Sequence, residues 1–197
     1  MNKIGIKSAF IAVLAAIICI GGFMIIPLGA VPIVLQNVLC ILAAVLIGGK
    51  LAGAPAALFL AAGLIGFPVY AGGRGGIGVW LGPTGGFLLG YLLGAVIAGF
   101  IAGTPSVSEK KICKSAIIRI SLAVFAGMVI LYIPGIIRFS AWAAAGGKIP
   151  QDKNLFTYTM GVCVLPYLPG DFLKTAVAIP VALKLRPIFA QYLHLEK

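Results

Sequence analysis

Two ionisable residues, Asp171 and Lys174, stand three positions apart at the start of a long apolar stretch. Spacing of i and i+3 puts the two side chains on one face of a helix. Ionisable groups within hydrophobic helices are usually functional and have a specific partner. Either the pair neutralises itself, or it is shared with a ligand, with Asp171 accepting N–H hydrogen bonds and Lys174 donating to a carbonyl or carboxylate. The second interpretation suits a small organic acid or amide.

A glycine-rich segment, residues 70–86 (YAGGRGGIGVWLGPTGG), supplies the second group of candidates. Glycine in a helix costs about 1 kcal/mol relative to Ala and gives access to positive φ angles, so this segment is not an ordinary helix. Irregular backbone at membrane depth is tolerated only against protein or along a cavity. We therefore expect the segment to form one wall of a binding site. The candidate residues in it are Arg74, Gly75, Gly76, Thr84 and Gly85.

Thr84 has a second expected role, and two further positions, Gln36 and Tyr91, complete the candidate site. Thr84 is predicted to be the N-cap of the helix that follows, whose free amides could receive an anion or a carbonyl oxygen. Gln36, with Asn37, forms the only polar pair near one end of a short apolar helix, and such side chains must find partners in a cavity or on another helix. Tyr91 lies in the helix after the glycine-rich segment and is added as a candidate.

The composition identifies the elements that must position these residues. Of 197 residues, 61% are hydrophobic and only 10% charged, and the mean hydropathy is +1.15. These values exclude a soluble globular domain. Long apolar runs without alternation exclude the strands of a membrane barrel. The net charge of +11 therefore reports membrane topology and does not indicate a nucleic-acid partner.

The pattern predicts an all-α integral membrane protein, with a bundle of six transmembrane helices forming a single membrane domain over residues 1–197. A glycine-rich outer loop follows the third helix, and Pro134-Gly135 ends the fifth. A long outer segment, residues 136–169, then precedes the sixth helix and could act as a lid or simply anchor the chain at the membrane interface. The predicted helices span about residues 6–28, 33–48, 51–67, 84–102, 115–133 and 171–185.

Basic residues set the expected orientation. Nine fall on the side of the termini and four on the other side, which places both termini in the cytoplasm and Asp171, Gln36 and the glycine-rich segment at the outer end. The nine are Lys3, Lys7, Lys50, Lys110, Lys111, Lys114, Lys184, Arg186 and Lys197, and the four are Arg74, Arg138, Lys148 and Lys153.

The sequence contains few residues that could form a catalytic site. The only histidine, His194, lies in the tail, far along the chain from any nucleophile at the outer end. Four scattered cysteines lack the spacing of a metal site, and no G-x-x-x-x-G-K-[ST] motif is present. We expect a binding protein without metal or catalytic residues, although a small intramembrane enzyme stays open as an alternative.

The first helix carries small residues four apart, Ala12 and Ala16. Small residues at this spacing let another helix approach closely in lipid. The approaching helix could belong to the same bundle or to an external partner.

The order and spacing of three motifs resemble the BioY family. The motifs are Ala71 to Gly76, Gly82-Pro83-Thr84-Gly85-Gly86, and Pro169-Gly170-Asp171 followed by Lys174. Members of that family are the biotin-specific substrate-binding subunits, or S components, of energy-coupling factor (ECF) transporters, and the resemblance covers essentially the whole chain.

The resemblance implies a six-helix protein in the plasma membrane of a prokaryote that captures biotin with high affinity from outside, with no cofactor. The implied partners are a transmembrane coupling subunit, which would pack on Ala12 and Ala16, and two cytoplasmic ATPase subunits. Asp171 would meet the ureido N–H groups of biotin. The valerate of biotin could meet Lys174, Arg74 or the amides of the helix after Thr84. An S component for another vitamin remains the nearest alternative.

Overall fold

The computed structural model describes residues 3–26, 33–107 and 113–193. Several residues used above lie outside these ranges, namely the end of the first predicted helix (residues 27 and 28) and Lys110, Lys111, His194 and Lys197.

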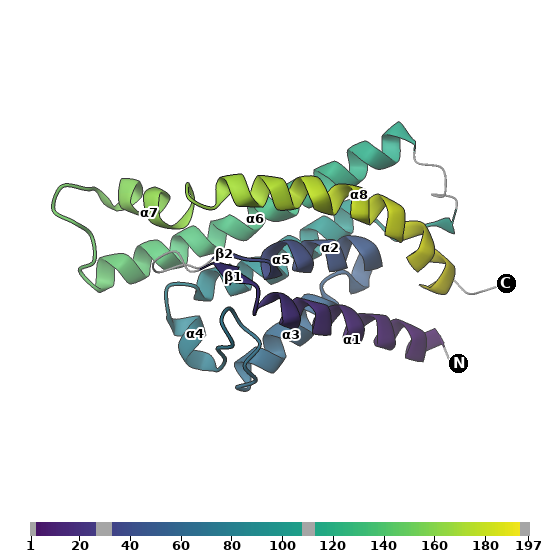
Figure 1. The fold of residues 1–197 in the computed structure, drawn as a ribbon, viewed down its shortest axis with the longest axis horizontal. Coiled ribbons are helices and arrows are strands. Elements are labelled where there is room, and N and C mark those ends of the chain that lie inside the picture. The colour runs from purple at the N-terminus through teal and green to yellow at the C-terminus, as the bar shows by residue number, and fades with distance from the viewer. Residues whose placement is uncertain (1–2, 27–32, 108–112, 194–197) are drawn as a thin grey trace.

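Helices dominate the described chain, as Figure 1 shows. A ribbon of two short antiparallel strands, β1 and β2, and a 3-10 helix, η1, complete it. The elements in order are α1 (Lys3–Gly21), β1 (Ile25–Ile26), β2 (Ile33–Val34), α2 (Gln36–Ile47), η1 (Gly49–Leu51), α3 (Ala54–Leu64), α4 (Ile77–Leu81), α5 (Gly85–Ala102), α6 (Lys114–Ala145), α7 (Leu155–Cys163) and α8 (Leu168–Leu193).

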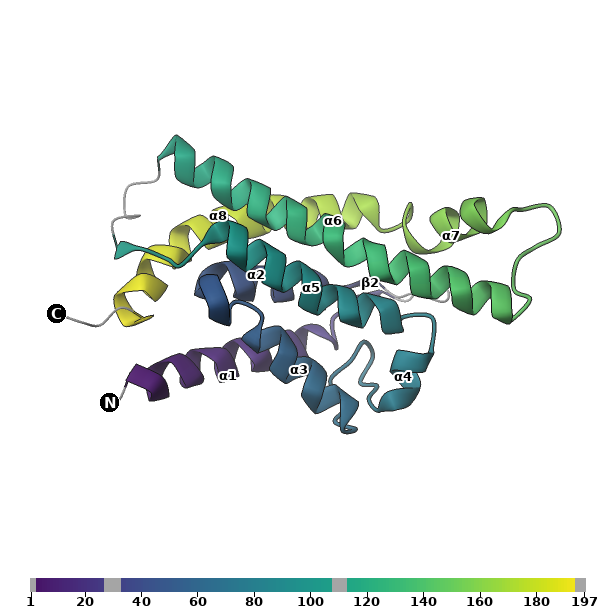
Figure 2. The ribbon, with the colours of Figure 1, turned by 180° about the vertical axis from the view of Figure 1, so that it is seen from behind.

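The prediction of an all-α membrane bundle is confirmed. Helices α5 and α6 are each long and apolar enough to cross a membrane, and α7 with α8 forms a third candidate span that is bent by 47°. Three shorter apolar helices, in residues 5–21, 36–47 and 49–64, bring the bundle to six, with α4 as a short addition. Both ends of the chain lie at the opposite end from α7 (Figures 1 and 2).

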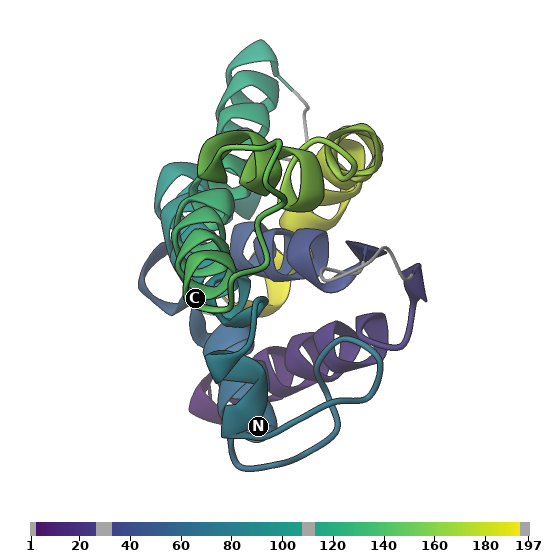
Figure 3. The same cartoon turned by 90° about the vertical axis from the view of Figure 1, so that its left-hand side faces the viewer.

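Helix α2 is the central element of the bundle. Ten of its twelve residues are buried, and it contacts α1, α3, α5, α6 and α8. In cross-section it lies between α1 on one side and α6 and α8 on the other (Figure 3). A helix that is apolar on all sides is expected in such a position. The first residues of α2, Gln36 and Asn37, are therefore held inside the protein.

Helices α5 and α6 approach each other at the level of their backbones. Gly86, Gly90 and Gly94 lie at i, i+4 and i+8 on α5 and face α6. A Cβ atom at Gly94 would lie 2.5 Å from the carbonyl oxygen of Gly127, and one at Gly90 would overlap the carbonyl of Leu131. Small residues at this spacing permit the close packing of membrane helices.

Helix α6 differs from the prediction, because it does not end at Pro134-Gly135 but continues to Ala145. Buried residues recur every four positions through the proline, at Leu131, Gly135, Phe139 and Ala143. Burial of this stripe favours continuation of the helix despite the backbone hydrogen bond that proline removes. The long outer segment is consequently shorter than predicted and contains α7.

The other boundaries also shift. Helix α1 ends at Gly21 where the prediction had residue 28, and α3 ends at Leu64 where it had residue 67. Helix α8 begins at Leu168 and continues through Pro180 and Pro187 to Leu193, beyond the predicted end at residue 185.

Arg186 of α8 is buried, with 1% of its surface exposed, although the sequence interpretation counted it only as a topology charge. Its guanidinium donates to the carbonyl oxygens of Val45, Ala102 and Gly103. The last carbonyls of a helix have no partner within the helix, so Arg186 joins the ends of α2 and α5 to α8.

Candidate functional site

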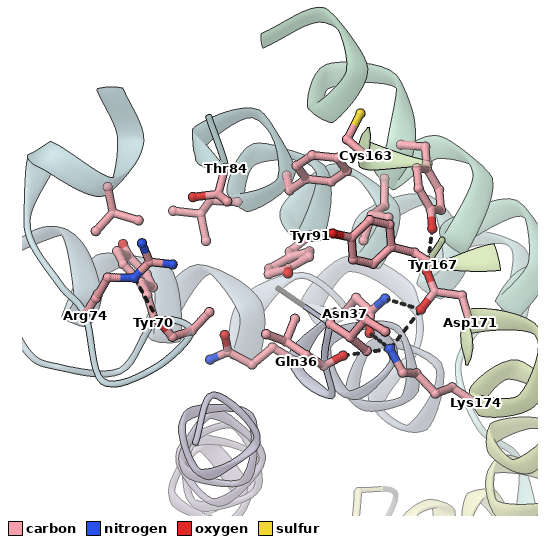
Figure 4. A pocket seen from close by; sticks show the side chains of 18 residues that line it. Gln36, Asn37, Tyr70, Arg74, Thr84, Tyr91, Cys163, Tyr167, Asp171 and Lys174 are labelled. Carbon is pink, nitrogen blue, oxygen red and sulfur yellow. Dashed lines mark hydrogen bonds and ion pairs between the residues drawn. The ribbon is translucent and has the colours of Figure 1, made fainter. Parts of the chain in front are cut away.

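A cavity lies between the first residues of α2, the loop after α3, α4 and the start of α8, and Figure 4 shows the side chains that line it. It contains about 610 Å³ of empty space, a volume that includes space open to solvent. Its walls come from β2, α2, the loop after α3, α4, α5, α6, α7 and α8. The lining residues are Ile33, Val34, Gln36, Asn37, Tyr70, Ala71, Arg74, Val79, Thr84, Phe87, Leu88, Tyr91, Leu131, Tyr132, Cys163, Tyr167, Asp171 and Lys174.

Asp171 is the centre of a polar cluster on one side of the cavity. Its Oδ1 accepts hydrogen bonds from Lys174 Nζ at 2.8 Å and Asn37 Nδ2 at 2.9 Å. Its Oδ2 accepts one from Tyr132 Oη at 2.6 Å. The carboxylate is 7% exposed, and a buried charge of this kind needs such partners. Three helices, α2, α6 and α8, thus meet at one acceptor.

Lys174 makes two contacts besides its ion pair with Asp171. Its Nζ donates to the carbonyl oxygen of Val34 in β2 at 2.8 Å and lies 3.4 Å from Asn37 Oδ1. All three donor positions of the ammonium therefore have acceptors within the protein.

Gln36 is 1% exposed and lines the cavity. Its Nε2 donates to the carbonyl oxygens of Ile18 at 3.2 Å and Val69 at 2.7 Å. The two polar residues that begin α2 therefore have different partners. Gln36 binds α1 and the loop after α3, whereas Asn37 binds Asp171.

The turn at residues 70–74 presents Arg74 to the cavity. Tyr70 N donates to Arg74 O at 2.8 Å, and Gly73 N donates to Tyr70 O at 2.9 Å. Gly72 and Gly73 have φ angles of 73° and 71°, which glycine adopts without steric cost. The guanidinium of Arg74 donates from Nε to Ala71 O at 3.0 Å. Arg74 lies on the opposite side of the cavity from Asp171 and Lys174 (Figure 4).

Tyr70 anchors this turn to the bundle. Its hydroxyl donates to Leu60 O at 2.6 Å and accepts from Trp80 Nε1 at 2.8 Å, and its ring packs edge-on against Phe59. Burial raises the pKa of the Tyr70 phenol above its ordinary value, against a smaller lowering effect of the Trp80 hydrogen bond. The hydroxyl consequently remains a donor at neutral pH.

Apolar and aromatic side chains fill the region between the two polar sides. Tyr91 and Tyr167 lie between Arg74 and Asp171 (Figure 4), and Phe87 packs edge-on against Tyr132. Cavities of this type, apolar in the middle with a few placed polar groups, bind small amphiphilic molecules.

Four of the predicted glycine-rich positions have different surroundings. Thr84 lines the cavity and lies at the predicted N-cap position of α5, where its carbonyl oxygen accepts from Phe87 N and Leu88 N. Its side chain, however, makes no capping hydrogen bond. Gly75, Gly76 and Gly85 are outside the lining. Gly76 N donates to Gly63 O at 2.7 Å, and Cβ atoms at Gly75 and Gly85 would overlap the carbonyls of Phe67 and Trp80.

Sequence reasoning did not select Asn37 or Tyr132 as site residues. Asn37 carried a signal, because it shares with Gln36 the one polar position of an apolar helix. Tyr132 carried none, since its place beside Asp171 is a tertiary contact between residues 39 positions apart.

Arg138 of α6 is a further missed contact. It donates to the carbonyl oxygens of Leu81 and Gly82 at the end of α4 and thereby fixes the glycine-rich loop to the long helix.

Helix α7 covers the outer end of α6. Tyr158 stacks on Phe139 with ring centroids 6.1 Å apart, and the hydroxyls of Ser140 and Thr159 are 3.0 Å apart. Cys163 at its end reaches the cavity. The suggestion that this region acts as a lid stays a prediction.

Ala12 and Ala16 are both exposed on the outer face of α1, next to Val13 and Ile17, which are 58% and 42% exposed. These two small residues therefore do not pack against another helix of the bundle. Among the described residues, no group of three or more His, Cys, Asp or Glu side chains could hold a metal ion.

Comparisons with known proteins match almost the whole chain. The model of the BioY family matches residues 2–191. A biotin transporter BioY of Rhodobacter capsulatus is 37% identical over 169 residues, covering 85% of this chain and 86% of the relative. One of Thermotoga maritima is 32% identical, covering 89% and 93%. The crystal structure of an S-component for biotin from an ECF-type ABC transporter superposes with a TM-score of 0.76, at 30% identity, over 94% of both chains.

Proposed function

The chain belongs to the BioY family, and from this premise we propose that it is the high-affinity biotin-binding S component of an ECF-type ABC transporter. It is a multi-pass membrane protein that binds its substrate and does not transform it. Biotin is the ligand in this proposal, and no cofactor takes part.

The observation that carries the proposal is the set of polar groups around Asp171. A cyclic urea offers two N–H donors beside one carbonyl acceptor. The Asp171 carboxylate can accept from the N–H groups, while Asn37 Nδ2, Lys174 Nζ or Tyr132 Oη can donate to the carbonyl. These donors already lie within 2.9 Å of the carboxylate, so the ureido ring exchanges one set of hydrogen bonds for another at little cost in desolvation.

We assign the carboxylate of biotin to Arg74. Lys174 is already neutralised by Asp171 at 2.8 Å, whereas Arg74 donates only to a backbone carbonyl and has no acidic partner among the described residues. A guanidinium binds a carboxylate with strong, charge-assisted hydrogen bonds. The fused rings and the valerate chain would then cross the aromatic region containing Tyr91 and Tyr167 (Figure 4).

The partners and orientation in the membrane form part of the same proposal. Both termini would lie in the cytoplasm, so the cavity would open to the outside of a prokaryotic cell, in agreement with the excess of basic residues at the termini. A transmembrane coupling subunit would dock on the exposed face of α1 at Ala12 and Ala16, and two cytoplasmic ATPase subunits would supply the energy.

Equilibrium binding of radiolabelled biotin to the purified protein in detergent tests this function. We expect saturable binding that excess unlabelled biotin displaces and other vitamins do not. Displacement by another vitamin at a lower concentration than that of unlabelled biotin would identify that vitamin as the substrate. Absence of binding by protein with a cooperative thermal unfolding transition would overturn the proposal.

A further inference from the structure

A second cavity lies at the other end of the molecule, where the chain begins and ends. The start of α1, the turn between α2 and α3, and the end of α8 come together there (Figure 2). The cavity contains about 850 Å³ of empty space, including the part open to solvent. Its lining residues are Lys7, Ile11, Ile47, Gly48, Gly49, Lys50, Leu51, Thr104, Pro105 and Leu193.

The lining combines two cations with an apolar wall. Lys7 and Lys50 have no acidic partner among the described residues, and the hydroxyl of Thr104 is a third donor. Ile11, Ile47 and Leu193 form the apolar side. In the described chain, the acidic residues Asp152 and Asp171 both belong to the opposite end. The cavity therefore suits a ligand with a negatively charged head and a hydrocarbon body.

The position of the cavity distinguishes it from the surface proposed for the coupling subunit. Lys7 and Ile11 share a face of α1 with Leu14 and Ile18, which are buried at 7% and 0% exposure. Ala12 and Ala16 project from the exposed side of the same helix. A helix docked on the small residues would not enter the cavity, which lies behind α1 between that helix, η1 and α8.

We propose that this cavity binds an anionic membrane phospholipid, with the phosphate between Lys7 and Lys50 and an acyl chain along Ile11, Ile47 and Leu193. Lysines near the ends of membrane helices hold their ammonium groups at the level of lipid headgroups. An anionic lipid gains about 1 kcal/mol from each nearby basic residue. The bound lipid would tie the start of α1 to the end of α8.

Native mass spectrometry of the full chain tests this site with two probes, dioleoyl phosphatidylglycerol and dioleoyl phosphatidylcholine. We expect wild-type protein to retain phosphatidylglycerol in preference to phosphatidylcholine. Lys7→Gln with Lys50→Gln should lower that preference by about fivefold for each charge removed. The matched control, Lys148→Gln with Lys153→Gln, removes two cations from the opposite end and should leave it unchanged.

Biotin binding at the first cavity tests whether each variant is folded. If the double variant is unstable, Lys50→Gln alone, at an exposed position, should lower the preference for phosphatidylglycerol by an intermediate amount. Equal retention of the two lipids by wild-type protein would overturn the site. Inorganic phosphate that displaces phosphatidylglycerol at equal concentration would reassign the site to free phosphate. Loss of co-purification with the coupling subunit, with lipid retention unchanged, would reassign it to the partner.

Discussion

Tyr132 Oη lies 2.6 Å from Asp171 Oδ2, although the two residues are 39 positions apart and belong to different helices. This hydrogen bond joins α6 to α8 at the cavity wall, and Asn37 adds α2 to the same carboxylate. The fold therefore brings three helices to one acceptor. Substitutions at that acceptor should affect both ligand binding and the packing of the bundle.

Replacement of Asp171 by Ala should remove most biotin binding. The ligand N–H groups would lose their acceptor, at a cost of about 1 to 3 kcal/mol or more. Equilibrium binding of labelled biotin measures the effect, and Asp152→Ala, an exposed carboxylate in the loop before α7, is the matched control. Near-normal affinity of Asp171→Ala would remove this residue from the site.

Replacement of Arg74 by Gln should weaken biotin binding by about tenfold to a hundredfold, because a charge-assisted hydrogen bond is lost. The same variant should bind the methyl ester of biotin as well as wild-type protein does. Competition binding with the two ligands gives both values, with Lys148→Gln as the control for loss of an outer cation. An equal loss of affinity for acid and ester would assign the carboxylate to another group.

Replacement of Ala12 by Trp should impair assembly with the coupling subunit and leave biotin binding intact, since a large side chain prevents the close approach of a second helix. Co-purification of the tagged partner measures assembly. Leu122→Trp, which changes a 57% exposed position on α6, tests whether any surface tryptophan has this effect. Loss of biotin binding with intact assembly would contradict the assignment.

Replacement of Gly90 by Ala should lower the free energy of unfolding by about 1 to 3 kcal/mol, because the added methyl group overlaps the backbone of α6. Thermal unfolding in detergent measures the change. Gly161→Ala is the matched control, as no atom lies within 4 Å of the methyl group that it adds, and its effect should stay within about 1 kcal/mol. An equal change in the free energy of unfolding in the two variants would show that α5 and α6 can move apart without loss of stability.

Replacement of Arg186 by Met should destabilise the protein by about 1 to 3 kcal/mol or more, since three carbonyl oxygens lose their donor. Lys184→Met removes an exposed cation two residues away and should have little effect on the unfolding temperature. If Arg186 served only to orient the protein in the membrane, the two substitutions would lower the unfolding temperature equally.

The helices were predictable from the sequence because apolar runs of this length have few alternatives in a membrane. Helix α5 matches its predicted range to within one residue at the start. The boundaries that failed depend on tertiary packing. Pro134 is a helix breaker in isolation, and only the buried stripe from Leu131 to Ala143 reveals that α6 continues.

The site was predictable where a polar residue stood alone in an apolar background, as Asp171, Lys174 and Gln36 do. Arg74 and Tyr91 also line the cavity. Gly75, Gly76 and Gly85 were selected for their conformational freedom, and Gly76 does adopt a positive φ of 84° with open space around its Cβ position. At Gly75 and Gly85 the structure instead uses the lack of a side chain to bring backbone segments together. From sequence alone these two uses of glycine are indistinguishable.

The contact between α5 and α6 has a consequence for how a ligand enters and leaves. Because the two backbones are in direct contact at Gly86, Gly90 and Gly94, we expect α5 and α6 to move together, so that the part of the cavity that they form is a fixed wall. The turn at residues 70–74 and α7 are held by hydrogen bonds and ring contacts that can break one at a time. We therefore expect the rates of ligand entry and exit to depend on these two segments, and the shape of the pocket to depend on the two long helices.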